Sequence, residues 1–168
     1  LQAVPVDVLI AVAAPETLPA ASRCPRPVRY QRDLPHLKHV GTFPLFEHRR
    51  AALQAGADDA LFVGDGGVIS EGTTWNIGLS AGDTLVWPQA PALRGTHERL
   101  LQAGWNGDQQ RRPVELAALP GFSGAFACNS VGVWPISRID GRVLPDSEAL
   151  CARARAVLAA VPWQPLGG

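Results

Sequence analysis

Residues 60–76 read ALFVGDGGVISEGTTWN, and this stretch decides the fold that we expect for the chain. Residues 60–63 form a short apolar run, which is typical of a buried strand. Asp65-Gly66-Gly67 is a strong turn signal, and Val68-Ile69 resumes the apolar pattern directly after it. Two apolar segments joined by a short glycine-containing turn predict a β-hairpin.

The sequence on either side of this hairpin predicts more strands and a few helices. Apolar or alternating runs bounded by turn residues predict strands at residues 7–12, 28–32, 74–79, 84–87, 126–128 and 133–136. Apolar spacing and boundary residues predict helices from Pro44 to just before Gly56, at Thr96–Ala103, and at Ser147–Ala160 with Ser147 as N-cap. This order favours an α+β fold, a mixed and partly closed β-barrel-like sheet with flanking helices, over a doubly wound α/β sheet.

The composition excludes several classes of protein. The 168 residues are enough for one domain with a core, and 46% hydrophobic against 18% charged residues argues against disorder. Basic and acidic residues number 15 each, so nothing electrostatic points to nucleic acid or an anionic membrane as partner. The apolar run at residues 4–14 is too short to span a bilayer and lacks the basic start of a signal peptide.

Cysteine and histidine spacing indicates neither a disulfide framework nor a metal site. The three cysteines are widely separated and include no CxxC pair, which is typical of a reduced, cytoplasmic protein. His36 and His39 lie three residues apart without further metal-ligand spacing around them, so we expect no bound metal.

Lys38 is the first candidate for chemistry. It is the only lysine in the sequence, and the other 14 of the 15 basic residues are arginine. It lies in a predicted loop between a strand and a helix. A desolvated lysine amine can form an imine, whereas an arginine guanidinium stays protonated and cannot. A solvated surface lysine is the alternative interpretation.

Glu71 is the second candidate, because it lies between two predicted strands, where an acid is costly to bury unless it is paired. A protonated pyridine nitrogen would be one such partner, and the ion pair would make the ring a better electron sink. The alternative is a turn glutamate that caps a backbone amide.

Two further segments have groups that suit a phosphate. Gly95-Thr96-His97 opens a predicted helix, whose first amides are free to bind an anion, although many ordinary helices begin in the same way. Asn129-Ser130 follows a predicted strand and offers two small polar side chains, although an Asx or Ser/Thr turn would use the same residues.

Taken in this order, these segments resemble the class IV aminotransferase family, the fold type IV pyridoxal-phosphate enzymes. The resemblance runs from about Val28 to Gly141 and is most specific at residues 56–63, at residues 67–72 and at Asn76, with a lysine 71 − 38 = 33 residues before the glutamate.

The resemblance implies a role for each candidate. Lys38 would carry pyridoxal 5'-phosphate as a Schiff base, and Glu71 would face the pyridine nitrogen. Gly95, Thr96 and His97 would form one phosphate contact, and Asn129 and Ser130 the other. Residues 1–26 would be a strand and linker connected to a missing N-terminal domain, and residues 27–168 the cofactor-binding domain.

The implied activity is transamination of an amino acid or amine with a keto acid, in a homodimer. An alternative is the lyase branch, in which the same lysine releases pyruvate from aminodeoxychorismate. A second alternative is a truncated, non-catalytic homologue used for binding or dimerisation. The threonine usual in the family's Gly-Ile/Val-Thr motif is displaced here to Gly95-Thr96-His97, and Phe43 stands where branched-chain enzymes often have tyrosine.

Overall fold

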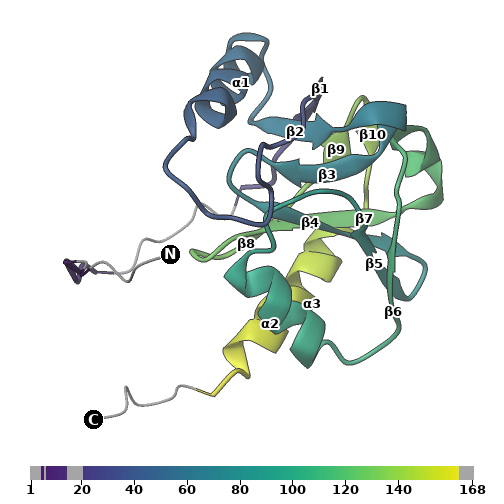
Figure 1. Ribbon diagram of the computed structural model, residues 1–168. Coiled ribbons are helices and arrows are strands. Elements are labelled where there is room, and N and C mark those ends of the chain that lie inside the picture. The colour runs from purple at the N-terminus through teal and green to yellow at the C-terminus, as the bar shows by residue number, and fades with distance from the viewer. Residues whose placement is uncertain (1–4, 6, 15–20, 163–168) are drawn as a thin grey trace.

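The computed structural model describes residues 5, 7–14 and 21–162 (Figure 1). Its helices are α1 (Phe43–Gln54), α2 (Thr96–Gly104) and α3 (Ser147–Ala159), with 3-10 turns at Asp65–Gly67 and Leu116–Gly121. Its strands are β1 (Arg26–Arg29), β2 (Ala60–Val63), β3 (Ile69–Gly72), β4 (Asn76–Ala81), β5 (Thr84–Pro88), β6 (Gln109–Arg112), β7 (Gly124–Cys128), β8 (Val133–Pro135), β9 (Arg138–Ile139) and β10 (Arg142–Val143). Within the described ranges, no helix combines the length and apolarity needed to cross a membrane.

The described strands form three sheets. The largest has the order β6-β5-β4-β7-β8, in which β5 and β6 run parallel and the other pairs run antiparallel. A second sheet has the order β1-β2-β3, and β9 pairs with β10 in a third. The predicted α+β class is therefore confirmed, whereas no described sheet closes on itself and the barrel-like closure stays a prediction.

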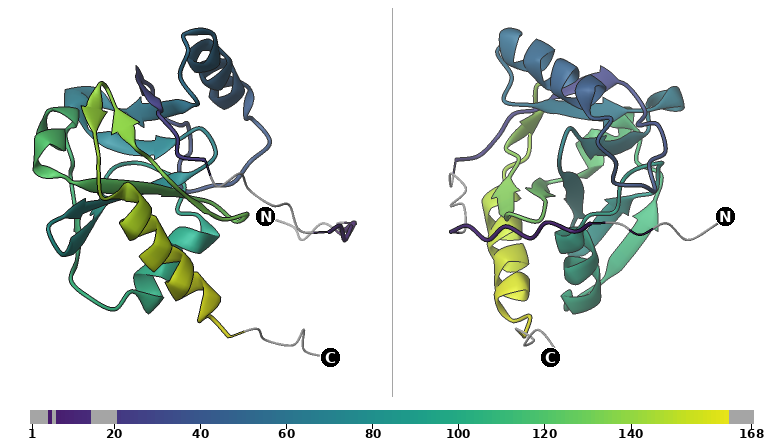
Figure 2. Two further views of the ribbon diagram at one scale, coloured as in Figure 1. Left: turned by 180° about the vertical axis from the view of Figure 1, so that it is seen from behind. Right: turned by 60° about the vertical axis from the view of Figure 1, so that its left-hand side comes forward.

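The five-stranded sheet lies in the middle of the molecule and has a covered face on each side. Helices α2 and α3 lie side by side on one face, and the β1-β2-β3 sheet lies on the other, with α1 beyond it (Figures 1 and 2). Successive residues of β7 serve the two faces in turn: Ala125 and Ala127 join the core between the sheets, whereas Phe126 and Cys128 join the core beneath the helices. Strand alternation thus builds both cores.

The hairpin predicted from residues 60–76 is present. Strand β2 pairs antiparallel with β3, and every residue of both strands is buried. Gly66 and Gly67 have φ angles of 74° and 79°, a conformation that favours glycine over residues with a side chain. Strand β3 follows this turn and contains Glu71, which lies in the interior and is only 3% exposed.

Strands β1 and β2 run parallel, so the chain between them must cross over from one end of the sheet to the other. This crossover, residues 30–59, consists of a loop followed by helix α1, which packs Leu45 and Ala52 against Ala60 and Phe62. The loop contains Lys38, and it leaves the carboxyl end of β1 beside the five-stranded sheet.

The strand predicted over residues 7–12 is wrong. The structure describes residues 7–14 without regular structure, and the side chains of Val8, Leu9, Ile10 and Val12 are 78–94% exposed. A strand must pair its backbone amides and carbonyls with a neighbouring strand. This segment has the composition of a strand without such a neighbour among the described residues.

Two other predictions also need correction. The strand predicted at residues 28–32 begins and ends earlier, as β1, so Arg32 lies beyond it in the loop. Ser147 is the first residue of α3 and not its N-cap, which is Asp146. The Ser147 hydroxyl instead donates to the carbonyl oxygens of Ile136 and Leu144 and accepts from the Ala125 amide, so it ties α3 to β7.

Candidate functional site

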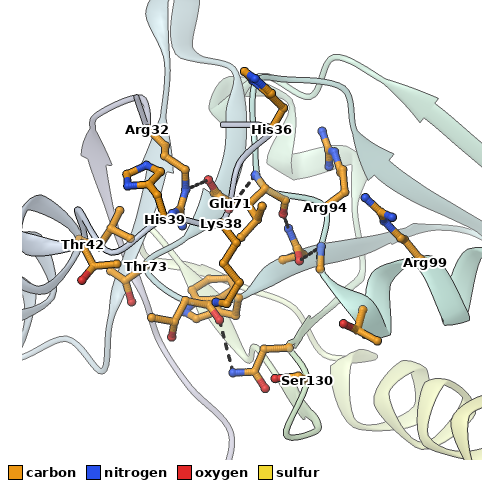
Figure 3. A pocket seen from close by; sticks show the side chains of 18 of the residues that line it. Arg32, His36, Lys38, His39, Thr42, Glu71, Thr73, Arg94, Arg99 and Ser130 are labelled. Carbon is orange, nitrogen blue, oxygen red and sulfur yellow. Dashed lines mark hydrogen bonds and ion pairs between the residues drawn. The ribbon is translucent and has the colours of Figure 1, made fainter. Parts of the chain in front are cut away.

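A cavity of about 730 Å³ opens where four connections meet (Figure 3). They are the β1–α1 loop, the β3–β4 turn, the β5–α2 loop and the β7–β8 turn. Of the predicted site residues, Lys38, Glu71, Gly95, Thr96, Asn129 and Ser130 all line this cavity. Residues up to 92 positions apart in sequence are therefore brought together, whereas His97 is not among the lining residues.

Glu71 forms a buried ion pair at the inner end of the cavity. The Nε of Arg32 donates to Oε1 of Glu71 at 2.9 Å, and the two side chains are 6% and 3% exposed. The backbone amide of Leu93 donates to Oε2 at 3.2 Å. Burial raises the pKa of Glu71, while the hydrogen bond and charge of Arg32 lower it. The guanidinium thus favours the ionised carboxylate that burial alone would disfavour.

Lys38 lies in the crossover loop between β1 and α1 and extends from it into the cavity (Figure 3). The residue is exposed. The ring of its neighbour His39 organises the loop: Nδ1 accepts from the Gly41 amide at 3.0 Å, and Nε2 lies 3.3 Å from the Asp33 carbonyl oxygen. Because Nδ1 accepts, Nε2 carries the proton and donates to Asp33.

The start of α2 forms the third side of the cavity. Gly95 is the N-cap, with no side-chain capping hydrogen bond, and Thr96 is the first helical residue. The amides of the first helical turn have no acceptor within the helix, so they face outward as donors for an anion. Arg99 lines the cavity beside them and adds positive charge to this end, whereas the guanidinium of Arg94 is paired with Glu98.

His97 and the β7–β8 turn fit the prediction less directly. Nδ1 of His97 is buried without a hydrogen-bond partner among the described residues. The Asn129 carboxamide oxygen accepts from the amides of Val131 and Gly132, as in an Asx turn. Asn129 therefore shapes the turn, and exposed Ser130 is the side chain at this wall that has a free hydroxyl to offer.

The β3–β4 turn that forms the cavity floor is held by a buried acid. Asp59 is 1% exposed and accepts from the hydroxyl of Thr73 at 2.7 Å and from the indole Nε1 of Trp75 at 3.1 Å. Arg23 and Arg49 approach the same carboxylate at 3.9 and 3.8 Å. These contacts fix Trp75 over Gly72, where even an added Cβ would overlap the indole ring.

Sequence reasoning missed two residues of this site. Arg32 was expected at the end of an alternating strand, and nothing in its spacing marks it as the partner of a glutamate 39 positions later. Asn76 was quoted only as part of a motif, although its side chain binds the β5–α2 loop. For Asn76 the useful signal is a polar residue next to a run of buried apolar ones, which demands a buried partner. Arg32 has exposed neighbours, Gln31 and Asp33, and gives no such signal.

The chain is similar to known proteins in sequence pattern and in fold. The family model for amino-transferase class IV matches residues 5–139. No curated protein matches the chain by sequence.

Solved structures resemble the chain over more than four fifths of its length. A fold IV-transaminase from Curtobacterium pusillum is 25% identical over 85% of this chain and 55% of its own, with a TM-score of 0.74. A protein named as a 4-amino-4-deoxychorismate lyase from Legionella pneumophila is 21% identical over 86% of this chain and 57% of its own, with a TM-score of 0.78. A hypothetical aminotransferase from Mycobacterium tuberculosis, solved in its PLP-bound form, is 22% identical over 83% and 55%, with a TM-score of 0.73. The chain therefore spans little more than half the length of these proteins.

Proposed function

This chain belongs to the amino-transferase class IV family, and we propose that its cavity binds pyridoxal 5'-phosphate with Lys38 as the covalent attachment point. The observation that carries the proposal is that the only lysine and a buried, arginine-paired glutamate line one cavity. A relative solved in its PLP-bound form supports the same cofactor.

The groups that line the cavity fit this cofactor. An acid at one end suits a protonated ring nitrogen, and free helix amides with Thr96 and Arg99 at the other suit a phosphate. Both oxygens of Glu71 are already hydrogen-bonded, but a carboxylate has about four lone-pair positions, so about two stay open to a further donor. We propose that Thr96 and the helix amides that follow the N-cap Gly95 contact the phosphate from one side and Ser130 from the other, with Asn129 shaping its turn.

When bound, the cofactor supplies an electron sink that makes the Cα proton of an amino acid acidic. The task of Lys38 is then to move that proton. Its Nζ, once uncharged, accepts the proton from the substrate Cα and returns it at a second carbon, as general base and then general acid. With the cofactor bound, Glu71, paired with Arg32, would stabilise a positive charge at the ring nitrogen.

We propose transamination between an amino acid or amine and a keto acid as the reaction. Pyruvate release from aminodeoxychorismate is the alternative within the family. This chain covers little more than half of the proteins that resemble it, so part of a complete substrate pocket would come from residues beyond these 168. We further propose that residues 1–26 connect to that part, that residues 27–168 form the cofactor-binding domain, and that the protein works as a cytoplasmic homodimer.

Reductive trapping tests the cofactor proposal. The chain is mixed with pyridoxal 5'-phosphate and reduced with borohydride, and the modified peptide is located by mass spectrometry. We expect one adduct per chain, at Lys38. The control is Lys38→Arg, which keeps the charge but cannot form an imine. Equal labelling of the control, or labelling of the wild type only at its amino terminus, would refute the proposal.

Two assays on the trapping-competent protein then choose the reaction. Keto-acid formation from D- and L-amino acids supports transamination, whereas pyruvate from aminodeoxychorismate supports the lyase. Cofactor binding with neither activity would support the third interpretation, a binding or dimerisation domain, over catalysis by these 168 residues alone.

A further inference from the structure

We propose that Asn76 is a positioning residue that holds the acid end and the phosphate end of the cavity in register with each other. The inference rests on the proposed function, because the two ends have a common ligand only if the cavity binds a phosphorylated ring. It assigns to Asn76 a task distinct from contact with the cofactor itself.

The side chain of Asn76 makes a two-point contact with the β5–α2 loop. Its Nδ2 donates to the Leu93 carbonyl oxygen at 2.6 Å, and its Oδ1 accepts from the Gly95 amide at 3.1 Å. The carboxamide thus pairs with the backbone on both sides of Arg94, as a neighbouring strand would. Asn76 is 4% exposed, so water does not compete freely for these bonds.

The same three loop residues reach both ends of the proposed ligand. At one end, the Leu93 amide donates to Oε2 of Glu71 at 3.2 Å. At the other end, Gly95 is the N-cap of α2, and Thr96 begins the helix whose free amides face the cavity. A shift of this segment would therefore move the acid's hydrogen bond and the phosphate-binding amides together.

The loop is also anchored from its far side. The guanidinium of Arg94 donates to the carbonyl oxygens of Pro88 and Ala90 at 3.2 and 2.7 Å and to Glu98 at 3.0 Å. These bonds tie the segment to the end of β5 and to α2. They leave Asn76 as its side-chain link to β4, the strand that follows the Glu71 hairpin.

Gly95 shows how closely the two partners fit. A Cβ on Gly95 would lie 2.6 Å from Oδ1 of Asn76. The φ and ψ angles of Gly95 are −72° and 165°, which any residue can adopt. The side-chain contact, and not the backbone conformation, therefore requires glycine at this position.

The experiment measures binding at each end separately, by quenching of tryptophan fluorescence. Pyridoxal 5'-phosphate probes both ends, pyridoxal probes the ring end without the phosphate, and inorganic phosphate as competitor probes the phosphate end. Thr96→Ala and Glu71→Gln serve as references, each expected to weaken one end only. We expect Asn76→Ala to weaken the binding of pyridoxal and of phosphate by about tenfold each, corresponding to ~1.4 kcal/mol.

Gly95→Ala provides a second, independent perturbation, because it leaves Asn76 and the sheet intact. In the otherwise wild-type protein, we expect Gly95→Ala to weaken the binding of pyridoxal and of phosphate to a similar extent. In the Asn76→Ala background, where Oδ1 is absent, we expect the same change to weaken the binding of each by less than twofold. Circular dichroism and thermal melting verify that each variant is folded. If Asn76→Ala is unfolded, the single variant Gly95→Ala tests the inference by itself. Loss at one end only, or additive effects in the double variant, would overturn the inference. Failure of the wild type to bind pyridoxal 5'-phosphate at all would instead overturn the proposed function.

Discussion

Replacing Arg32 by methionine should leave Glu71 as an unpaired acid in a buried site, at a large cost in stability. The two side chains are 6% and 3% exposed, and Nε lies 2.9 Å from Oε1. At this distance, with an effective dielectric constant of about 20, Coulomb's law gives roughly 6 kcal/mol of attraction, part of which offsets the desolvation of both ions. Removing one partner of a buried pair typically costs about 3–5 kcal/mol. For a chain of this size, that corresponds to a decrease in Tm of roughly 6–20 °C.

The loss should also depend on pH, with a definite sign. Burial already raises the pKa of Glu71 and Arg32 lowers it, so the variant should raise that pKa further. A folded state with a raised carboxyl pKa binds more protons than the unfolded state between the two pKa values. The stability of Arg32→Met should therefore fall as pH rises above the ordinary glutamate range, and the variant should come closest to the wild type in acid.

Denaturant unfolding of four proteins at pH 5 and pH 8 measures this effect. They are the wild type, Arg32→Met, Glu71→Gln and the double variant. Because the double variant buries no charge, we expect it to recover most of the stability that Arg32→Met loses. A loss that is the same at both pH values, or a double variant no more stable than Arg32→Met, would refute the assignment of a buried, charged pair.

Two further predictions concern the cavity floor, and a third concerns the cysteines. Asp59→Asn removes a carboxylate acceptor from a fully buried network and should lower the free energy of unfolding by about 1–3 kcal/mol in urea titrations; an unchanged midpoint would contradict the network. Gly72→Ala places a methyl group in the Trp75 ring and should reduce the Tm and shift the tryptophan emission to the red; a native emission spectrum would contradict the contact. Of the three thiols only Cys24 should react rapidly with a disulfide reagent at pH 8, because the other two are buried and burial raises the pKa of both; three rapid equivalents per folded chain would contradict their burial.

Much of the fold could be predicted because local signals agreed with tertiary packing. The start of α1 depends on Pro44, which restricts the backbone, whereas its end before Gly56 and the hairpin through Gly66 depend on glycines that permit a positive φ. Signals of this kind act before any distant contact is made. Lys38 and Glu71 could be named for a related reason, since a lone lysine and an acid between apolar runs are both unusual within their immediate surroundings.

What could not be predicted depends on partners far away in sequence. Residues 7–12 have the apolar composition of a strand, but strand formation needs a neighbour, and composition does not supply one. The pairing of Arg32 with Glu71 and the contact of Asn76 with the β5–α2 loop are fixed only when separate elements pack together. Periodicity reports which face a residue is on, and it does not report which polar group that residue meets.

The parallel pairing of β1 with β2 has a consequence for how the chain folds. These strands meet only after the whole intervening segment, residues 30–59, has closed into a loop, whereas β2 and β3 need to close only a tight turn. Closing the hairpin that carries Glu71 therefore costs less chain entropy than closing the connection that carries Lys38. The cavity exists only when both segments are closed, so its two charged groups are brought together by steps of unequal entropic cost.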